Sequence, residues 1–207
     1  MNEPARKLED IEIVGGHVAV DFVNTVSSWN SDMPGDYLGD FDDFLQWNEM
    51  AGLMGPNSLR NLRATDERDQ ALAIAEVRRL RQSLHEILVA RATGRPLPRG
   101  ALEHLNDVIR KTAAWRRLAA DEDTDYRDIC CLWDFSGAPA IAALGPVAWK
   151  AAELLELGDL ERLKECPGEN CGWLFLDTSK NRSRQWCSMK TCGNTAKVRR
   201  FRERRQN

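Results

Sequence analysis

Residues 165–194 read ECPGENCGWLFLDTSKNRSRQWCSMKTCGN, and the cysteines in this stretch decide how the end of the chain folds. Two close pairs are joined by a longer span in the pattern C-x4-C-x15-C-x4-C, formed by Cys166, Cys171, Cys187 and Cys192. Each pair can supply two thiolates to one edge of a tetrahedron, at the about 2.3 Å that separates zinc from sulfur. Pro167-Gly168 lets the chain turn between the first two ligands. The spacing therefore predicts one zinc ion bound by all four cysteines.

The alternatives are two disulfide bonds or four unrelated buried thiols. The first residues lack the basic start and apolar run of a secretory signal. No stretch approaches the roughly 18 apolar residues of a membrane span. We therefore expect a cytoplasmic protein without a membrane partner, in which thiols stay reduced and bind metal. Because all four predicted ligands come from the protein, no position is open for water, and we expect a structural site.

The span between the cysteine pairs has the pattern of a β-hairpin. Two arms, residues 173–176 and 184–186, flank a polar tip from Asp177 to Ser183. A segment of about 45 residues is close to the size at which a fold usually needs a metal, and zinc would stabilise this one.

The rest of the chain is typical of a helical protein, with 43% hydrophobic and 29% charged residues. Apolar periodicity and capping residues predict helices from His17 to about Ser28, from near Asp40 to Gly55, and over 57–93, 97–117 and 138–157. The helix over 57–93 is expected to break near Thr65-Asp66. Its predicted buried stripe is Leu72, Val77, Leu80, Leu84, Ile87 and Leu88.

Two smaller features complete the prediction for this part of the chain. Residues 11–14 read as a short extended piece, and residues 115–135 predict a small β-hairpin around the acidic turn 121–125. In that hairpin, we expect one of the adjacent Cys130 and Cys131 to face the core and the other to face outward. The predicted fold is thus mainly α with a small β-hairpin. A helical N-terminal domain, 1–158, precedes a small zinc-bound β-hairpin plus helix module, 159–207.

The charge is distributed unevenly along the chain. Residues 161–207 contain 12 Lys+Arg and 5 Asp+Glu, a net +7, whereas residues 1–160 contain 17 and 27, a net -10. Four thiolates around Zn²⁺ would add about -2, so the module stays near +5. A basic end on an acidic body points to a polyanion or an acidic partner.

The basic charge gathers after the last cysteine, where residues 193–205 have helical propensity and 199–205 contain five arginines. We expect Val198 and Phe201 to pack on the zinc hairpin, which leaves Lys197 and other basic residues exposed. The guanidinium fork binds phosphate oxygens bidentately, so nucleic acid is the leading partner. The alternatives are a solvated helix or one docked on the acidic body. The predicted nucleic-acid-binding residues are Arg182, Arg184, Lys190, Lys197, Arg199, Arg200, Arg202, Arg204 and Arg205.

A second candidate site is the group of polar residues near the start of the chain. A helix would place Asp21, Asn24 and Thr25 near one face, with His17 one turn earlier. Such a cluster could bind a small effector and make this domain a sensor. The alternative is that these side chains satisfy neighbouring backbone groups and helix ends. His85 and His104 are expected to be surface or core residues and not ligands.

With these residues in view, the C-terminal module resembles the CGNR zinc finger. The matching runs are CGWLFLD at 171–177, RQWCSM at 184–189 and Cys192-Gly193-Asn194. The preceding part resembles the ABATE domain through residues 15–26 and 40–52. The resemblance implies a bacterial, stress-related transcription regulator with a zinc-dependent DNA-binding end. The final arginine of the CGNR signature is Thr195 here, and Lys197 or Arg199 could replace its contact.

The sequence thus predicts a DNA-binding transcription regulator with one structural zinc ion. An RNA-binding or protein-interaction adaptor that uses the same zinc module is the alternative. An enzyme is not expected, because no paired nucleophile and base, phosphate-binding loop or open metal site is recognisable.

Overall fold

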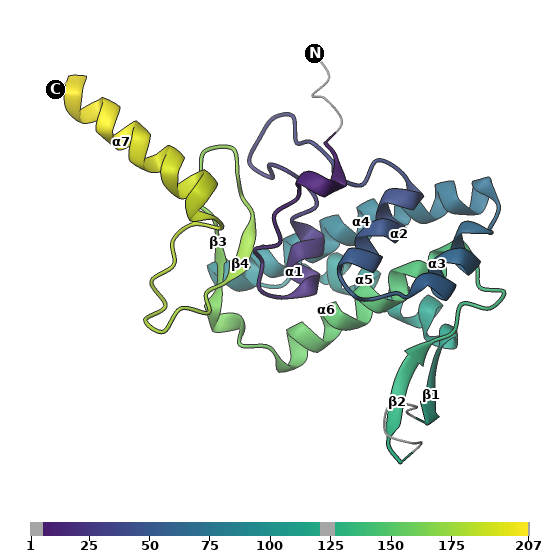
Figure 1. Cartoon of the computed structure of the whole chain (residues 1–207). Coiled ribbons are helices and arrows are strands. Elements are labelled where there is room, and N and C mark those ends of the chain that lie inside the picture. The colour runs from purple at the N-terminus through teal and green to yellow at the C-terminus, as the bar shows by residue number, and fades with distance from the viewer. Residues whose placement is uncertain (1–5, 121–126, 207) are drawn as a thin grey trace.

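The computed structural model describes residues 6–120 and 127–206, and helices dominate these ranges (Figure 1). They contain seven α-helices: α1 Val18–Val23, α2 Phe41–Met50, α3 Pro56–Arg63, α4 Glu67–Thr93, α5 Arg99–Thr112, α6 Gly145–Leu157 and α7 Asn194–Gln206. Two antiparallel sheets pair β1 Arg116–Ala120 with β2 Ile129–Trp133, and β3 Leu163–Glu165 with β4 Leu174–Leu176. The predicted fold class, mainly α with a small β-hairpin, is confirmed.

The long helix α4 forms where the sequence predicts it, after a break at Thr65. Its N-cap is Asp66, whose side chain accepts a hydrogen bond from the Asp69 backbone amide, and its C-cap is Gly94. Gly94 adopts a φ of 66°, a left-handed conformation that glycine tolerates best. Within the predicted stripe, five side chains are buried, namely Val77, Leu80, Leu84, Ile87 and Leu88. The prediction for Leu72 is wrong: it is 63% exposed, because Ala73, one position later, occupies the inward side.

Four predicted helices are shorter in the structure, and one of them is α2, which ends at Met50 instead of near Gly55. The first ends at Val23 instead of Ser28, because Asn24 turns its side chain to another part of the chain and Val26 bridges to Asp36. The helix predicted over 97–117 ends at Thr112, where the chain turns into β1. The run over 138–157 begins as a 3-10 turn, Ala140–Leu144, before α6.

The predicted hairpin over 115–135 is confirmed in its two strands. Its acidic turn, 121–125, lies outside the described residues. Figure 1 shows β1 and β2 extending away from the helices, so few neighbours cover them. Cys131 is exposed, as expected for one of the two cysteines, but the expectation that the other faces the core is wrong, because Cys130 is only half-buried.

One hydrophobic core joins the helices to the cysteine-rich end. Leu174 and Phe175 of β4 are fully buried in the same cluster as Phe22 and Trp47. Helix α1 lies between α6 and β4 and contacts both. The cysteine-rich end is therefore packed on the helical part and shares its hydrophobic core. None of the helices in 6–120 and 127–206 combines the length and apolar character needed to cross a membrane.

Candidate metal centre and nucleic-acid interface

The four predicted zinc ligands come together in the folded chain. The Sγ atoms of Cys166, Cys171, Cys187 and Cys192 all lie within 4.8 Å of one another. Sγ of Cys187 is 3.6 Å from Sγ of Cys171 and 3.7 Å from Sγ of Cys192. A tetrahedron with zinc–sulfur bonds of about 2.3 Å has edges of about 3.8 Å. The donor set and its spacing therefore fit a four-thiolate zinc ion.

Local backbone geometry brings the first two ligands together. Cys166 directly follows β3, and its amide donates to the Trp173 carbonyl at 2.7 Å, which extends the β3–β4 pairing. The Cys171 amide donates to the Gly168 carbonyl at 3.0 Å and closes the turn between the two ligands. A Cβ atom at Gly168 would lie 2.9 Å from the Cys192 sulfur, so only glycine lets the turn approach the second pair this closely.

The second pair leads directly into α7. Cys192 lies within a π-helical turn, Met189–Gly193, that continues into α7 without a break. The Gly193 amide donates to the Ser188 carbonyl at 3.0 Å, which holds this turn together. A metal bound by Cys192 would therefore fix the base of α7.

Proximity separates the pKa values of the clustered thiols. Hydrogen bonds from Cys171 and Cys187 hold the pKa of the Cys166 thiol far below its usual value. The hydrogen bond to Cys166 in turn raises the pKa of Cys171 to about 12, and the pKa values of Cys187 and Cys192 are also raised. The protein alone thus favours one thiolate over four. A divalent cation supplies the positive charge that four adjacent thiolates need.

The predicted zinc hairpin is wrong in its pairing. Strand β4 pairs with β3, which precedes Cys166, and not with residues 184–186. The reason lies in Asp177, a fully buried carboxylate that organises the segment after β4. It accepts hydrogen bonds from Lys164 Nζ at 2.6 Å and from the Arg184 amide at 3.0 Å, so residues 184–186 close a loop around a side chain. Burial alone would raise the pKa of Asp177, but the Lys164 and Ser179 hydrogen bonds outweigh it and hold the pKa well below the usual range.

Helix α7 projects from the cysteine cluster and leaves the acidic body behind (Figure 1). Every residue from Lys197 to Arg205 is exposed. The expectation that Val198 and Phe201 pack on the zinc hairpin is wrong, since they are 49% and 60% exposed. The side of α7 that meets the cysteine turns carries Ala196 and Arg199 instead.

The structure separates the predicted nucleic-acid-binding residues into two groups. Eight are exposed: Arg182, Lys190, Lys197, Arg199, Arg200, Arg202, Arg204 and Arg205. Two of these eight are held in ion pairs. Arg182 pairs with Glu161 at 3.4 Å, and Arg199 pairs with Glu169 at 3.1 Å. Arg184 is half-buried and lies 4.3 Å above the centre of the Phe175 ring. It donates to the backbone carbonyls of Trp186, Val14 and Cys187, so its donors are used inside the protein.

Two known family models match the chain, one over the helical part and one over the cysteine-rich end. The family model of ABATE, described as "Putative stress-induced transcription regulator", matches residues 16–157. The chain belongs to the ABATE family. The model of the CGNR zinc finger matches residues 162–205, which include all four cysteines and most of α7. Both descriptions are of a regulator or zinc-finger type and neither is of an enzyme. A search of curated proteins finds no match to the chain.

The ABATE region and the CGNR finger share hydrogen bonds across their junction. Asn24 of α1 uses both ends of its side-chain amide on Leu174: Nδ2 donates to the carbonyl at 2.9 Å, and Oδ1 accepts from the amide at 3.0 Å. The Asn24 side chain thus makes the two backbone hydrogen bonds that a third strand would make at this position of β4. Close by, the Trp29 amide donates at 2.8 Å to the carbonyl of Cys171, one of the four clustered cysteines. The ABATE region therefore holds the backbone that carries the cysteines.

The other three candidate effector residues also have partners within the protein. His17 caps α1 by accepting from the Ala19 amide at 3.2 Å. Thr25 donates to the Phe22 carbonyl and accepts from Arg81. Asp21 accepts from the Gly15 and Val14 amides at 2.7 and 3.1 Å. These contacts are those of the capping alternative, and effector binding by this group stays a prediction.

His85 lies on α4 and His104 lies on α5, and both rings contact other side chains of the protein. His104 is buried and hydrogen-bonded to Ser83 at 2.8 Å and Glu76 at 3.0 Å. His85 stacks on Trp29 with the ring centres 3.8 Å apart. Burial lowers the pKa of His85 to about 4, so the ring is neutral at pH 7.

Proposed function

We propose that this ABATE protein is a zinc-dependent DNA-binding transcription regulator. The observation that carries the proposal is the position of the cysteine cluster, at the base of a projecting helix with six basic residues and one acidic residue among 194–206. Zinc would supply the link that holds the two cysteine turns together, and such sites contribute on the order of 10 kcal/mol to folding. The chain itself would supply everything that contacts DNA.

Two of the predicted ligands lie on the body of the protein and two lie on the segment that leads into α7. Cys166 and Cys171 belong to the β3–β4 turn, which is held by the ABATE region through Asn24 and Trp29. Cys187 and Cys192 belong to the segment that leads into α7. A metal shared by the two pairs would therefore fix the direction in which α7 leaves the body.

Helix α7 has dimensions and charge that suit the major groove. Its 13 residues span about 20 Å at a rise of about 1.5 Å per residue, and the groove of B-DNA, about 12 Å wide, admits an α-helix. The net charge of +5 over 194–206 is the charge that phosphates attract. Because α7 is exposed along Lys197–Arg205, a duplex can reach it without rearrangement of the body.

The test is binding of the zinc-loaded full chain to a fluorescent random-sequence DNA duplex, measured by anisotropy at several salt concentrations. Five phosphate contacts would give a slope of log K against log salt of about -4.5. The double variant R200E/R204E should abolish binding. A matched control, R60E/R68E, makes the same change in charge on exposed residues of α3 and α4.

The outcomes separate the proposal from the adaptor alternative. Equal loss of binding in R200E/R204E and R60E/R68E would mean that net charge, and not α7, attracts the DNA. Absence of duplex binding, with tight binding to a structured RNA, would favour an RNA adaptor. Removal of zinc with a chelator should abolish DNA binding, and its return should restore it.

A further inference from the structure

The exposed side of α7 carries an apolar ridge in the middle of its basic residues. We call Val198 and Phe201 the ridge; they are 49% and 60% exposed. The guanidinium carbon of Arg205 lies 5.5 Å from the centre of the Phe201 ring, which extends the ridge toward the C-terminus. Single exposed apolar side chains are common, but two that share one face of an otherwise charged helix form a small patch, and such a patch marks a surface that a partner can cover.

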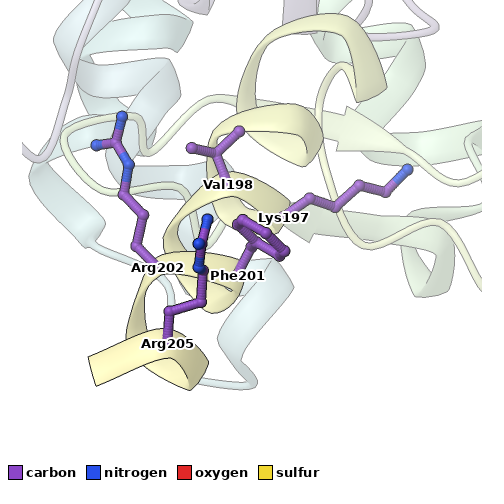
Figure 2. Close-up of a pocket in the computed structure, with 5 residues that line it drawn as sticks. All are labelled: Lys197, Val198, Phe201, Arg202 and Arg205. Atoms are coloured by element: carbon purple, nitrogen blue, oxygen red, sulfur yellow. The ribbon is translucent and has the colours of Figure 1, made fainter. Parts of the chain in front are cut away.

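The position of the ridge on the helix is set by helical geometry. At about 100° per residue, Val198, Phe201 and Arg205 fall within an arc of about 60°. Lys197 and Arg202 lie about 70° to either side of the centre of that arc. Figure 2 shows this arrangement, with the Lys197 and Arg202 side chains pointing to opposite sides of the helix.

The cysteine turns lie on the other side of the helix. Thr195, Ala196 and Arg199 line a small pocket with residues of the finger, including Gly168 and Cys192. Arg199 is also held there by its ion pair with Glu169. The finger therefore presents the ridge outward, away from the cysteine cluster.

Charge and area favour one occupant of this surface. A second copy of α7 would bring two helices of net charge +5 together, which like-charge repulsion opposes. A lipid surface requires a broad apolar face, whereas the ridge is two side chains on about one turn. The major groove of DNA offers phosphates on both walls, opposite Lys197 and Arg202. The C5-methyl group of thymine lies on its floor, opposite the ridge.

We propose that Val198 and Phe201 are the base-contacting residues of α7 and recognise thymine C5-methyl groups in the major groove. This inference rests on the proposed DNA-binding function and adds to it which face of the helix enters the groove. Lys197 and Arg202 then contact phosphates on the two walls. The preference is for thymine methyl groups, and it requires no hydrogen bond to a base edge.

The experiment compares duplexes that differ only in that methyl group. The zinc-loaded full chain is titrated against poly(dA-dT) and poly(dA-dU) duplexes at one salt concentration. Each contacted methyl group should contribute about fourfold in affinity, the value for one buried methylene. Methylation of cytosine at C5, tested as poly(dG-dC) against its 5-methylcytosine form, should increase affinity in the same way.

The variants V198A and F201A connect the preference to the ridge. Both side chains are exposed, so zinc content and circular dichroism should stay unchanged. Each variant should bring the ratio of poly(dA-dT) to poly(dA-dU) affinity toward one, while the salt slope stays the same. R60E/R68E should leave the ratio as it is.

Each result decides between the inference and the function on which it rests. Tight, salt-dependent binding with equal affinity for the two duplexes would overturn the ridge inference and leave the regulator proposal standing. A preference for thymine that persists in F201A and V198A would also overturn the inference. No binding to any duplex, with binding to vesicles of phosphatidylglycerol and phosphatidylcholine, would overturn both.

Discussion

Substitution of Asn24 by alanine should destabilise the whole molecule, because one side chain satisfies two buried backbone groups of the finger. Asn24 is fully buried and bonds both the amide and the carbonyl of Leu174, which is fully buried as well. A buried polar group that loses its partner costs about 1 to 3 kcal/mol. Two such groups give an expected loss of about 2 to 6 kcal/mol in the free energy of unfolding, in addition to the cavity left by the amide.

Asn48 provides the matched control for this prediction. It is also fully buried, but its Nδ2 donates within α2 to the Phe44 carbonyl, and its Oδ1 has no hydrogen-bond partner among the described atoms. The change N48A therefore removes the same atoms and strands no backbone group of another element. Its effect should be smaller than that of N24A by about 2 to 6 kcal/mol.

Urea unfolding of the zinc-loaded chain, followed by tryptophan fluorescence, measures both variants. We expect one cooperative transition whose midpoint falls in N24A while its m-value stays constant. Equal midpoints for N24A and N48A would refute the reasoning. Two separate transitions in the unchanged protein would refute the shared junction itself.

Three further predictions concern the junction and the metal centre. Burial raises the pKa of Asp21 to about 6 from 3.8, so between these pH values the native state binds more protons than the unfolded state, and stability falls as pH rises. Relative to D21N, the protein should therefore lose roughly 2 to 3 kcal/mol of stability between pH 4 and pH 7; a parallel pH dependence in both proteins would contradict this. R184A should lower the free energy of unfolding by more than it weakens the free energy of DNA binding, because Arg184 donates to three backbone carbonyls. A larger loss in the binding free energy would assign Arg184 to DNA contact. G168A should weaken zinc binding about tenfold or more, as changes beside metal ligands do, because its Cβ would crowd the Cys192 sulfur. Competition with a chromogenic chelator measures the zinc affinity. An unchanged affinity would show that the turn can shift.

The features that the sequence predicts well depend on residues close together in the chain. The limits of α4 follow from Asp66 and Gly94, whose capping chemistry acts within one helical turn. The cysteine cluster follows from two short spacings, because a metal allows few ways to place two ligands four residues apart. These signals need no knowledge of the rest of the fold.

The features that the sequence misses depend on distant partners. Asn24 and Leu174 are 150 residues apart, and their hydrogen bonds help to end α1 and complete the edge of β4. The β3–β4 pairing could have been suspected from Arg162-Leu163-Lys164, where an apolar residue stands between two basic residues shortly before Cys166. The apolar spacing of Val198 and Phe201 predicts an inward face, but the finger packs against the side of α7 that carries Ala196 and Arg199.

Zinc content and thiol reactivity of the purified, reduced chain test whether a metal organises the C-terminal end. Elemental analysis should find one zinc ion per chain, and of the six cysteines only Cys130 and Cys131 should react rapidly with a thiol reagent. After chelation, the remaining four thiols should react and the urea midpoint should fall. A chain without stoichiometric metal, or one in which all six thiols react with no change in circular dichroism, would contradict the proposed zinc site.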